Sequence, residues 1–100
     1  MKIRILDLAE ADLQVAHRFY EDQQTGVGDY FLDSIYSEID SLVLYAGIHT
    51  QIFGYHRQLC RRFPYAVYYS IDPDVISVWR VLDLRRDPAW IARQLRSSLL

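Results

Sequence analysis

The sequence predicts a single α+β domain over residues 1–100, in which an antiparallel pair of helices packs on a small, mainly antiparallel sheet. Three observations favour this class. Apolar residues recur at helical spacing in the first half, runs of β-branched and aromatic residues fill much of the second half, and turn residues separate those runs. Hydrophobic residues make up 51% of the chain and charged residues 24%, which is typical of globular domains and excludes disorder as the main state.

The N-terminal segment predicts a short strand followed by a helix. Residues 2–6 alternate polar and apolar side chains, as a half-buried strand does. Asp7 then stands where a helix cap belongs, with Glu10 three residues later. The helix extends to about Gln24, and two neighbouring rows form its predicted core-facing stripe: Leu8, Asp12, Val15 and Phe19, and Ala9, Leu13, Ala16 and Tyr20.

A second helix is predicted over residues 27–46. Gly26 and Gly28 interrupt the first helix, since glycine favours left-handed or open backbone. Gly47 is placed like a C-terminal cap. Because the connection between the two helices is short, they should fold back on each other as an antiparallel hairpin.

The second half predicts an antiparallel meander and a final helix. The expected strands are Ile52–Phe63, Tyr65–Ile71 and Val75–Leu82. Pro64 separates the first two strands, and residues 72–74 (Asp-Pro-Asp) form a tight turn between the last two. A short helix follows over residues 89–98, because Pro88 suits an early helical position. The predicted order is therefore β-α-α-β-β-β-α.

Charge is distributed unevenly along the chain, although the formal net charge is only −2. Residues 1–56 carry three cations against nine acids, whereas residues 57–100 carry eight arginines against four aspartates. Arginine offers a planar fork that binds carboxylate or phosphate in two places at once. We expect these guanidinium groups to share one docking surface for an acidic or phosphate-bearing partner, although arginines that merely solvate strands and a helix would give the same composition.

The usual catalytic and metal-binding patterns are weak, and no cofactor or metal is expected. His17 and Glu21 lie four residues apart on a predicted helix, a spacing that could hold a metal but is more typical of an exposed ion pair. Cys60 is followed by Arg61 and Arg62, which could lower its pKa, but a mostly buried structural thiol is the favoured interpretation. Gly26-Val27-Gly28 has no following Lys-Ser/Thr, so a phosphate-binding loop of that type is not indicated.

The sequence indicates a cytoplasmic domain. No apolar run approaches the roughly 20 residues of a membrane span, so no membrane partner is expected. Asp7 interrupts the N-terminal segment before a secretory signal core could form. Cys60 is the single cysteine and has no partner for an internal disulfide.

Several segments resemble the RelE/ParE superfamily of type II toxin–antitoxin toxins. The similarity runs in register over about residues 1–95. The segments are Phe19-Tyr20-Glu21, Gly26-Val27-Gly28 leading into Phe31, Arg61-Arg62-Phe63-Pro64-Tyr65-Ala66-Val67-Tyr68-Tyr69, Ile76 to Leu82, and Arg85-Arg86-Asp87-Pro88. The Arg-Phe-Pro-Tyr segment, followed about twenty residues later by Arg-Arg-Asp-Pro, is the most specific feature, and the superfamily has the predicted order of elements.

The resemblance implies a growth-inhibiting toxin, often associated with plasmid stabilisation, that a cognate antitoxin neutralises in a hetero-oligomeric complex. ParE-like members bind DNA gyrase and are not hydrolases, whereas RelE-like members enter the ribosome and cut mRNA. RelE-like nucleases are strongly basic and commonly use a C-terminal tyrosine. This chain has a pI near 5.8 and no tyrosine beyond Tyr69, so the ParE-like function is favoured and the nuclease is the alternative.

The candidate site residues follow from the same comparison. For target or antitoxin binding they are Arg57, Arg61, Arg62, Arg80, Arg85, Arg86 and Trp90. If the protein is a nuclease, the catalytic candidates are Arg57, Arg61, Arg85, Tyr65 and Tyr68, with the arginines as phosphate clamps.

Overall fold

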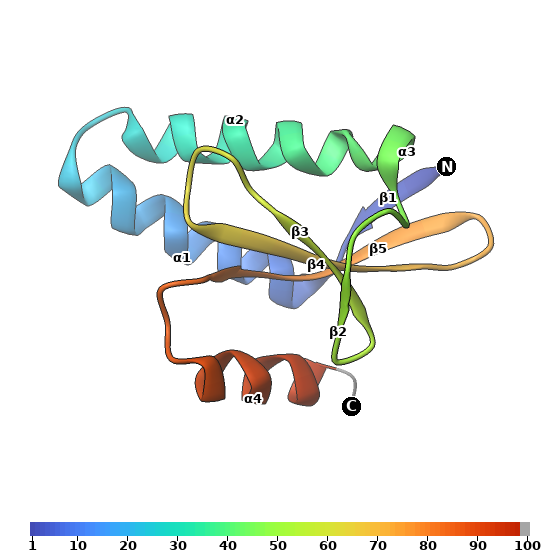
Figure 1. Ribbon diagram of the computed structural model, residues 1–100. Helices are drawn as coiled ribbons and strands as arrows, with labels where there is room; N and C mark the ends of the chain where they lie inside the picture. Colours follow the sequence, from blue (N-terminus) through green and yellow to red (C-terminus); the bar gives the residue numbers. More distant parts are fainter. Residues whose placement is uncertain (99–100) are drawn as a thin grey trace.

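The computed structural model describes residues 1–98. The chain folds into one mixed sheet with helices on both faces (Figure 1). The elements are β1 (Lys2–Ile5), α1 (Asp7–Gln23), α2 (Val27–Asp40), α3 (Leu42–Tyr45), β2 (Gln51–Ile52), β3 (Tyr55–Leu59), β4 (Tyr65–Ile71), β5 (Val75–Asp83) and α4 (Pro88–Ser98). The strand order is β1-β5-β4-β3-β2, in which only the β1–β5 pair is parallel. The predicted α+β class is thus confirmed.

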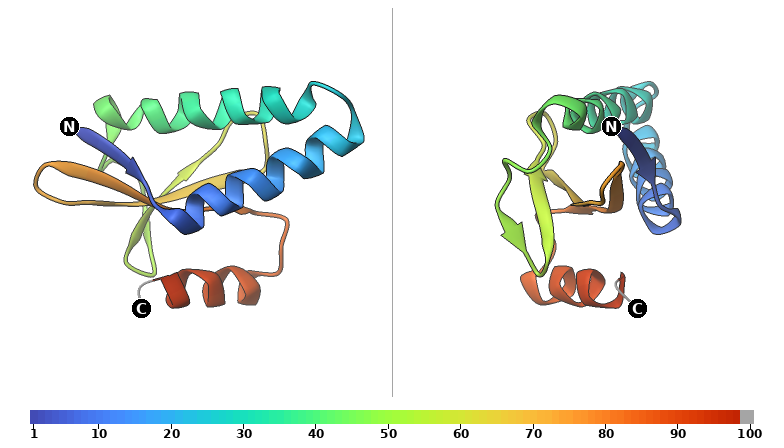
Figure 2. Two further views of the ribbon diagram at one scale, coloured as in Figure 1. Left: turned by 180° about the vertical axis from the view of Figure 1, so that it is seen from behind. Right: turned by 90° about the vertical axis from the view of Figure 1, so that its right-hand side faces the viewer.

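Two hydrophobic cores lie on opposite faces of the sheet. α1 and α2 pack on one face, where Leu13, Phe31, Ile35 and Tyr69 are fully buried. α4 covers the other face, where Leu95 packs with the second core cluster. Figure 2 shows this three-layer arrangement from the side, with α4 across the sheet from the helical hairpin. Because β4 is covered on both faces, all residues from Tyr65 to Tyr69 are buried.

A bulge in β5 adjusts which side chains face α4. Tyr68 pairs with Arg80 and Tyr69 pairs with Val78, so Trp79 is the extra residue of β5. A bulge of this kind lets two consecutive side chains lie on one side of a sheet. Trp79 packs edge-on against Tyr55, and Arg80 contacts α4.

Close packing and a shared carboxylate define the α1–α2 hairpin. Gly28 is buried, and a Cβ placed there would lie 2.6 Å from the carbonyl oxygen of His17 and 2.8 Å from the side chain of Glu21. The Glu21 carboxylate accepts the backbone N–H groups of Gly26 at 2.8 Å and Gly28 at 2.9 Å. Glu21, on α1, thereby satisfies free N–H groups at the start of α2.

Three expectations about the elements were wrong. The predicted strand from Ile52 to Phe63 is a tight β2–β3 hairpin, whose turn residues Phe53 and Gly54 both have positive φ, and the strand ends at Leu59. The predicted helix over residues 27–46 is interrupted at Ser41, which separates α2 from α3. Asp7 is the first residue of α1 and not its cap, because Leu6 occupies the cap position and offers no side-chain hydrogen bond.

Within residues 1–98, no helix combines the length and the apolar composition required to cross a bilayer.

Candidate functional site

A groove between α1 and α4 brings together four of the predicted site residues, Tyr65, Arg80, Arg86 and Trp90. Its volume is about 460 Å³, and it passes over the C-terminal part of β5. We call it the α1–α4 groove. It is lined by Asp12, Val15, Ala16, Phe19, Tyr65, Arg80, Val81, Leu82, Asp83, Arg86 and Trp90.

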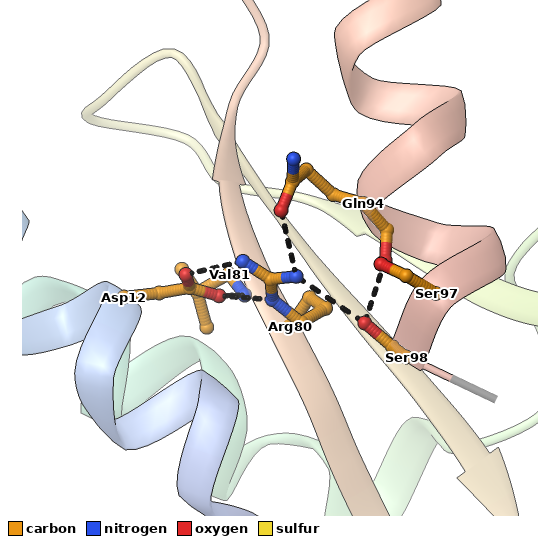
Figure 3. Close-up of polar contacts among 6 residues, drawn as sticks. All are labelled: Asp12, Arg80, Val81, Gln94, Ser97 and Ser98. Carbon is orange, nitrogen blue, oxygen red and sulfur yellow. Dashed lines mark hydrogen bonds and ion pairs between the residues drawn. The ribbon is translucent and has the colours of Figure 1, made fainter. Parts of the chain in front are cut away.

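A largely buried ion pair joins α1 to β5 at the base of the groove, and the same arginine also reaches α4 (Figure 3). The Nε and Nη2 atoms of Arg80 each donate to the Asp12 carboxylate at 2.8 Å, and the backbone N–H of Val81 donates to the same carboxylate at 2.9 Å. Nη1 of Arg80 donates to Gln94 at 3.1 Å and to Ser98 at 3.2 Å, both on α4. Hydrogen bonding from Arg80 to Asp12 raises the pKa of the arginine further.

This network changes the role expected of Arg80. Its side chain is only 9% exposed and that of Asp12 only 14% exposed, so the guanidinium lies behind the groove surface. All of its donor groups contact α1 or α4. We therefore expect Arg80 to hold the walls of the groove together and not to reach a partner itself.

Arg86 and Trp90 form the α4 side of the groove mouth. The Arg86 guanidinium carbon lies 3.8 Å from the centre of the Trp90 ring, a cation–π contact. Arg86 is exposed and Trp90 is half-buried. The arginine is thus held in place by the ring while it still presents charge to solvent.

The α1 side of the groove is apolar and exposed. Val15 is 72% exposed and Phe19 is 49% exposed, whereas every residue of the neighbouring row through Ala9 and Leu13 is buried. The expectation that both rows face the core was therefore wrong for the row that contains Val15 and Phe19. The sequence contained a signal for this, because two adjacent apolar rows are wider than one core-facing stripe requires.

Arg85 lies beside the groove, in a cluster with Tyr20 and the groove residue Tyr65. Arg85 donates to Asp83 through Nη2 at 2.8 Å and through Nε at 3.0 Å, and lies 3.4 Å from the Tyr20 hydroxyl. Burial, together with nearby Tyr20 and Asp83, raises the pKa of Tyr65. Burial also opposes ionisation of Asp83, but hydrogen bonds from Arg85 outweigh it and lower the pKa of that carboxyl.

Arg57 and Tyr68 are neighbours on the sheet face that α4 covers. They are paired residues of β3 and β4, and Tyr68 is 1% exposed. Burial raises the pKa of Tyr68, and the charge of Arg57 partly offsets this effect. The buried Nε of Arg57 has no hydrogen-bond partner among residues 1–98.

Arg61 and Arg62 lie in the β3–β4 connection, near α2. The guanidinium of Arg62 is 5.9 Å from the centre of the Tyr30 ring, and the backbone N–H of Arg61 donates to Glu38 at 3.3 Å. The predicted arginines thus occupy three places: the α1–α4 groove with its edge, the α4-covered face of the sheet, and the β3–β4 connection. The expectation of one shared guanidinium surface was wrong.

Two other candidate chemistries can be judged from the geometry. Burial and the charge of Glu38 raise the pKa of Cys60 to about 12, so this residue is a thiol and not a thiolate nucleophile at neutral pH. His17, Glu21 and Asp29 offer ligand atoms within 4.8 Å of one another. The Glu21 oxygens already accept two backbone N–H groups, however, and His17 Nε2 lies 2.9 Å from Asp29, so these contacts account for the cluster without a metal.

Comparison with known proteins relates the chain to a toxin–antitoxin structure through its fold. No protein-family model and no curated protein matches this chain. A chain in the solved structure described as "Chromosomal ParDE TA system from P. aeruginosa" superposes with a TM-score of 0.75 at 17% identity. The match covers 84% of this chain and 96% of that one. It confirms the predicted ParE-like fold.

Proposed function

We propose that this chain is the toxin of a bacterial type II toxin–antitoxin system and acts by binding a protein target in the cytoplasm, with DNA gyrase as the proposed target. The fold likeness to a chain of the ParDE system supports the class. The observation that carries the binding function is the α1–α4 groove, where exposed Val15 and Phe19 face the Arg86–Trp90 pair. An apolar wall opposite a fixed cation is suited to a protein surface.

The titratable groups of the groove support binding over hydrolysis. General acid–base catalysis needs a group whose pKa lies near the working pH. The Tyr65 hydroxyl is held protonated by burial, and hydrogen bonds from Arg85 lower the pKa of Asp83. Asp12 is engaged by Arg80, and arginines do not give up a proton at neutral pH.

We propose that a cognate antitoxin neutralises the protein through an acidic segment that folds on binding. The unequal charge of the two halves of the chain supports an acidic partner, and Arg61, Arg62 and Arg86 are exposed. Charge complementarity of this kind makes association sensitive to salt. If the affinity of the toxin–antitoxin complex changes by less than about twofold between low and high salt, the proposed charge complementarity is contradicted.

The alternative is a RelE-like, ribosome-dependent mRNA endonuclease. One observation favours it, since Arg85 lies 3.4 Å from the Tyr20 hydroxyl and interacts with Tyr65. An arginine beside tyrosines can bind a phosphate and stabilise the charge that develops during cleavage. Arg57 beside buried Tyr68 is a second arginine–tyrosine pair.

Two assays on the purified protein separate these functions. The proposal predicts inhibition of gyrase supercoiling at micromolar protein and no ribosome-dependent cleavage of mRNA by primer extension. The nuclease would instead be established if the native protein cleaves mRNA, the Arg85→Ala variant does not, and neither affects supercoiling by gyrase. If expression of this protein without its antitoxin leaves growth unaffected, both the gyrase-binding and the nuclease functions are contradicted. That result would indicate a protein that only binds its antitoxin.

A further inference from the structure

A second cavity, separate in its lining from the α1–α4 groove, lies between the C-terminal end of α2, α3 and β3. Its volume is about 330 Å³. We call it the β3-edge pocket. It is lined by Ser37, Glu38, Ser41, Tyr45, Ile48, His49, Gln58, Leu59 and Arg61. Its apolar lining residues are exposed, and Ile48 is 74% exposed, so this surface offers apolar contact area without a covering element among the described residues.

The adjoining edge of β3 is open. The backbone N–H of Arg57 donates to Thr50 at 2.9 Å, on the β2 side, whereas that of Cys60 donates to Tyr65 at 2.9 Å, on the β4 side. Since backbone groups alternate in direction along a strand, the N–H and carbonyl of Leu59 point to the β2 side. β2 pairs with Tyr55 and His56, and the Arg57–Thr50 hydrogen bond extends this pairing by one residue. The edge at Leu59 can therefore pair with another extended segment.

The floor of the pocket has an unmatched hydrogen-bond acceptor. Gln58 is 4% exposed, and its amide nitrogen donates to the Glu38 carbonyl at 2.9 Å, to Ser41 at 3.1 Å and to the Glu38 carboxylate at 3.3 Å. Its Oε1 has no partner within residues 1–98. That oxygen is sealed from solvent, so a ligand donor reaches it only when the Gln58 amide shifts toward the pocket. Because a buried acceptor without a donor is costly, such a shift would be favoured when a ligand supplies the donor.

A half-buried carboxylate adds negative charge beside that acceptor. Glu38 takes part in none of the ion pairs formed by residues 1–98. The negative charge of Glu38 helps to raise the pKa of Cys60. It also raises the pKa of His49, against the larger lowering effects of burial and His56. Arg61 lines the pocket but contacts Glu38 through its backbone N–H and not through its guanidinium.

We propose that the β3-edge pocket binds an extended segment of a partner protein, which pairs with Leu59 and inserts one arginine or lysine side chain toward Glu38 and Gln58. The aliphatic part of that side chain would pack against Tyr45 and Ile48, which line the pocket, and its charged end would lie near the Glu38 carboxylate and the Gln58 amide. Strand pairing sets the register, so that side chains alternate between the pocket and solvent. This inference goes beyond the proposed function and does not depend on toxin activity.

The test uses short peptides and the isotope-labelled full-length protein. The probe is an acetylated, amidated Thr-Val-Thr-Arg-Thr-Val-Thr peptide, with matched peptides that carry Gln or Glu at the central position. Titration followed by amide NMR should shift the signals of Arg57, Leu59 and Arg61, with a Kd on the order of 0.1–1 mM. The arginine peptide should bind about tenfold more tightly than the glutamine peptide.

Variants of the protein and the peptide separate the two parts of the proposal. Glu38→Gln should abolish the preference for arginine over glutamine, whereas Arg61→Gln should leave that preference intact or increase it. N-methylation of the peptide at the pairing positions should remove binding by either peptide. These changes report on recognition even if Glu38→Gln slightly alters stability.

Three results would overturn the inference. The first is equal binding of the three peptides, and the second is shifts confined to the α1–α4 groove. The third is concentration-dependent dimerisation that displaces the arginine peptide, which would assign the β3 edge to a second copy of this chain.

Discussion

Asp12 on α1 and Arg80 on β5 stand 68 residues apart in the chain and form an ion pair with two 2.8 Å hydrogen bonds. The same guanidinium reaches Gln94 and Ser98, so one side chain connects α1, the sheet and α4. A helix on each face of a sheet is normally held by its own apolar contacts. Here a polar network fixes the two helices relative to each other and thereby sets the width of the α1–α4 groove.

Removal of the Asp12 charge should destabilise the protein strongly. Asp12→Asn leaves the buried Arg80 guanidinium without its counter-charge, which costs about 3 kcal/mol of unfolding free energy. The matched control is Asp83→Asn, because its partner Arg85 is 55% exposed. That control should cost less than about 1 kcal/mol in the same urea titration. Equal losses in the two variants would show that burial does not set the strength of the Asp12–Arg80 pair.

The α1–α2 contact gives a prediction from steric fit. Gly28→Ala places a Cβ 2.6 Å from the backbone oxygen of His17, which cannot rotate away, so the helices must separate. We expect a loss of about 2 kcal/mol in unfolding free energy. Gly26→Asn is the control, because no atom lies within 4 Å of a Cβ there and asparagine tolerates the positive φ of 93°. A Gly28→Ala variant as stable as the control would refute this account of the helix contact.

The elements that the sequence predicted well are those with local signals. Residues 65–71 and 75–83 are rich in β-formers and are separated by an Asp-Pro-Asp turn, so the β4–β5 hairpin was predictable. The β2–β3 turn was missed, because residues 52–63 were predicted as one strand although Gly54 lies within them and glycine favours the positive φ found there. The position of α4 across the sheet was also missed, although the unbroken apolar run of β4 indicates burial on both faces.

The site was only partly predictable for a physical reason. Arg86 lies just before α4 and Trp90 lies in the first turn of that helix, so their contact is between residues only four positions apart. The partner of Arg80 lies on another element, and no local pattern identifies Asp12 as that partner. The three locations of the arginines depend in the same way on strand register and on the β5 bulge.

His49 should make the protein less stable in mild acid. Burial and the charge of His56 lower the pKa of His49, and Glu38 only partly offsets this. The hydroxyl of Tyr69 accepts the N–H of Gly47 at 2.9 Å, which leaves its proton free to donate to the neutral Nδ1 of His49. A folded-state pKa below the unfolded value means that the unfolded chain binds more protons, so stability is complete above the unfolded pKa and is lost as pH falls through the folded one.

The measurement is the urea midpoint at about pH 7.5 and at about pH 5.5, on either side of the usual histidine pKa. The midpoint should be lower at the acid pH in the native protein. In His49→Asn the difference should be smaller, because the titrating ring is absent. An identical pH dependence in the two proteins would assign the effect to other groups.

Charge reversal at the groove mouth should abolish function without unfolding the protein. Arg86→Glu replaces an exposed cation held over Trp90 by an anion, and it should weaken partner binding at least about tenfold. Lys2→Glu is the matched charge reversal at an exposed residue outside the lining of the groove, and it should leave growth inhibition intact. Circular dichroism and urea titration should give native-like curves for both variants. If the two variants inhibit growth equally well, the target binds elsewhere on the molecule.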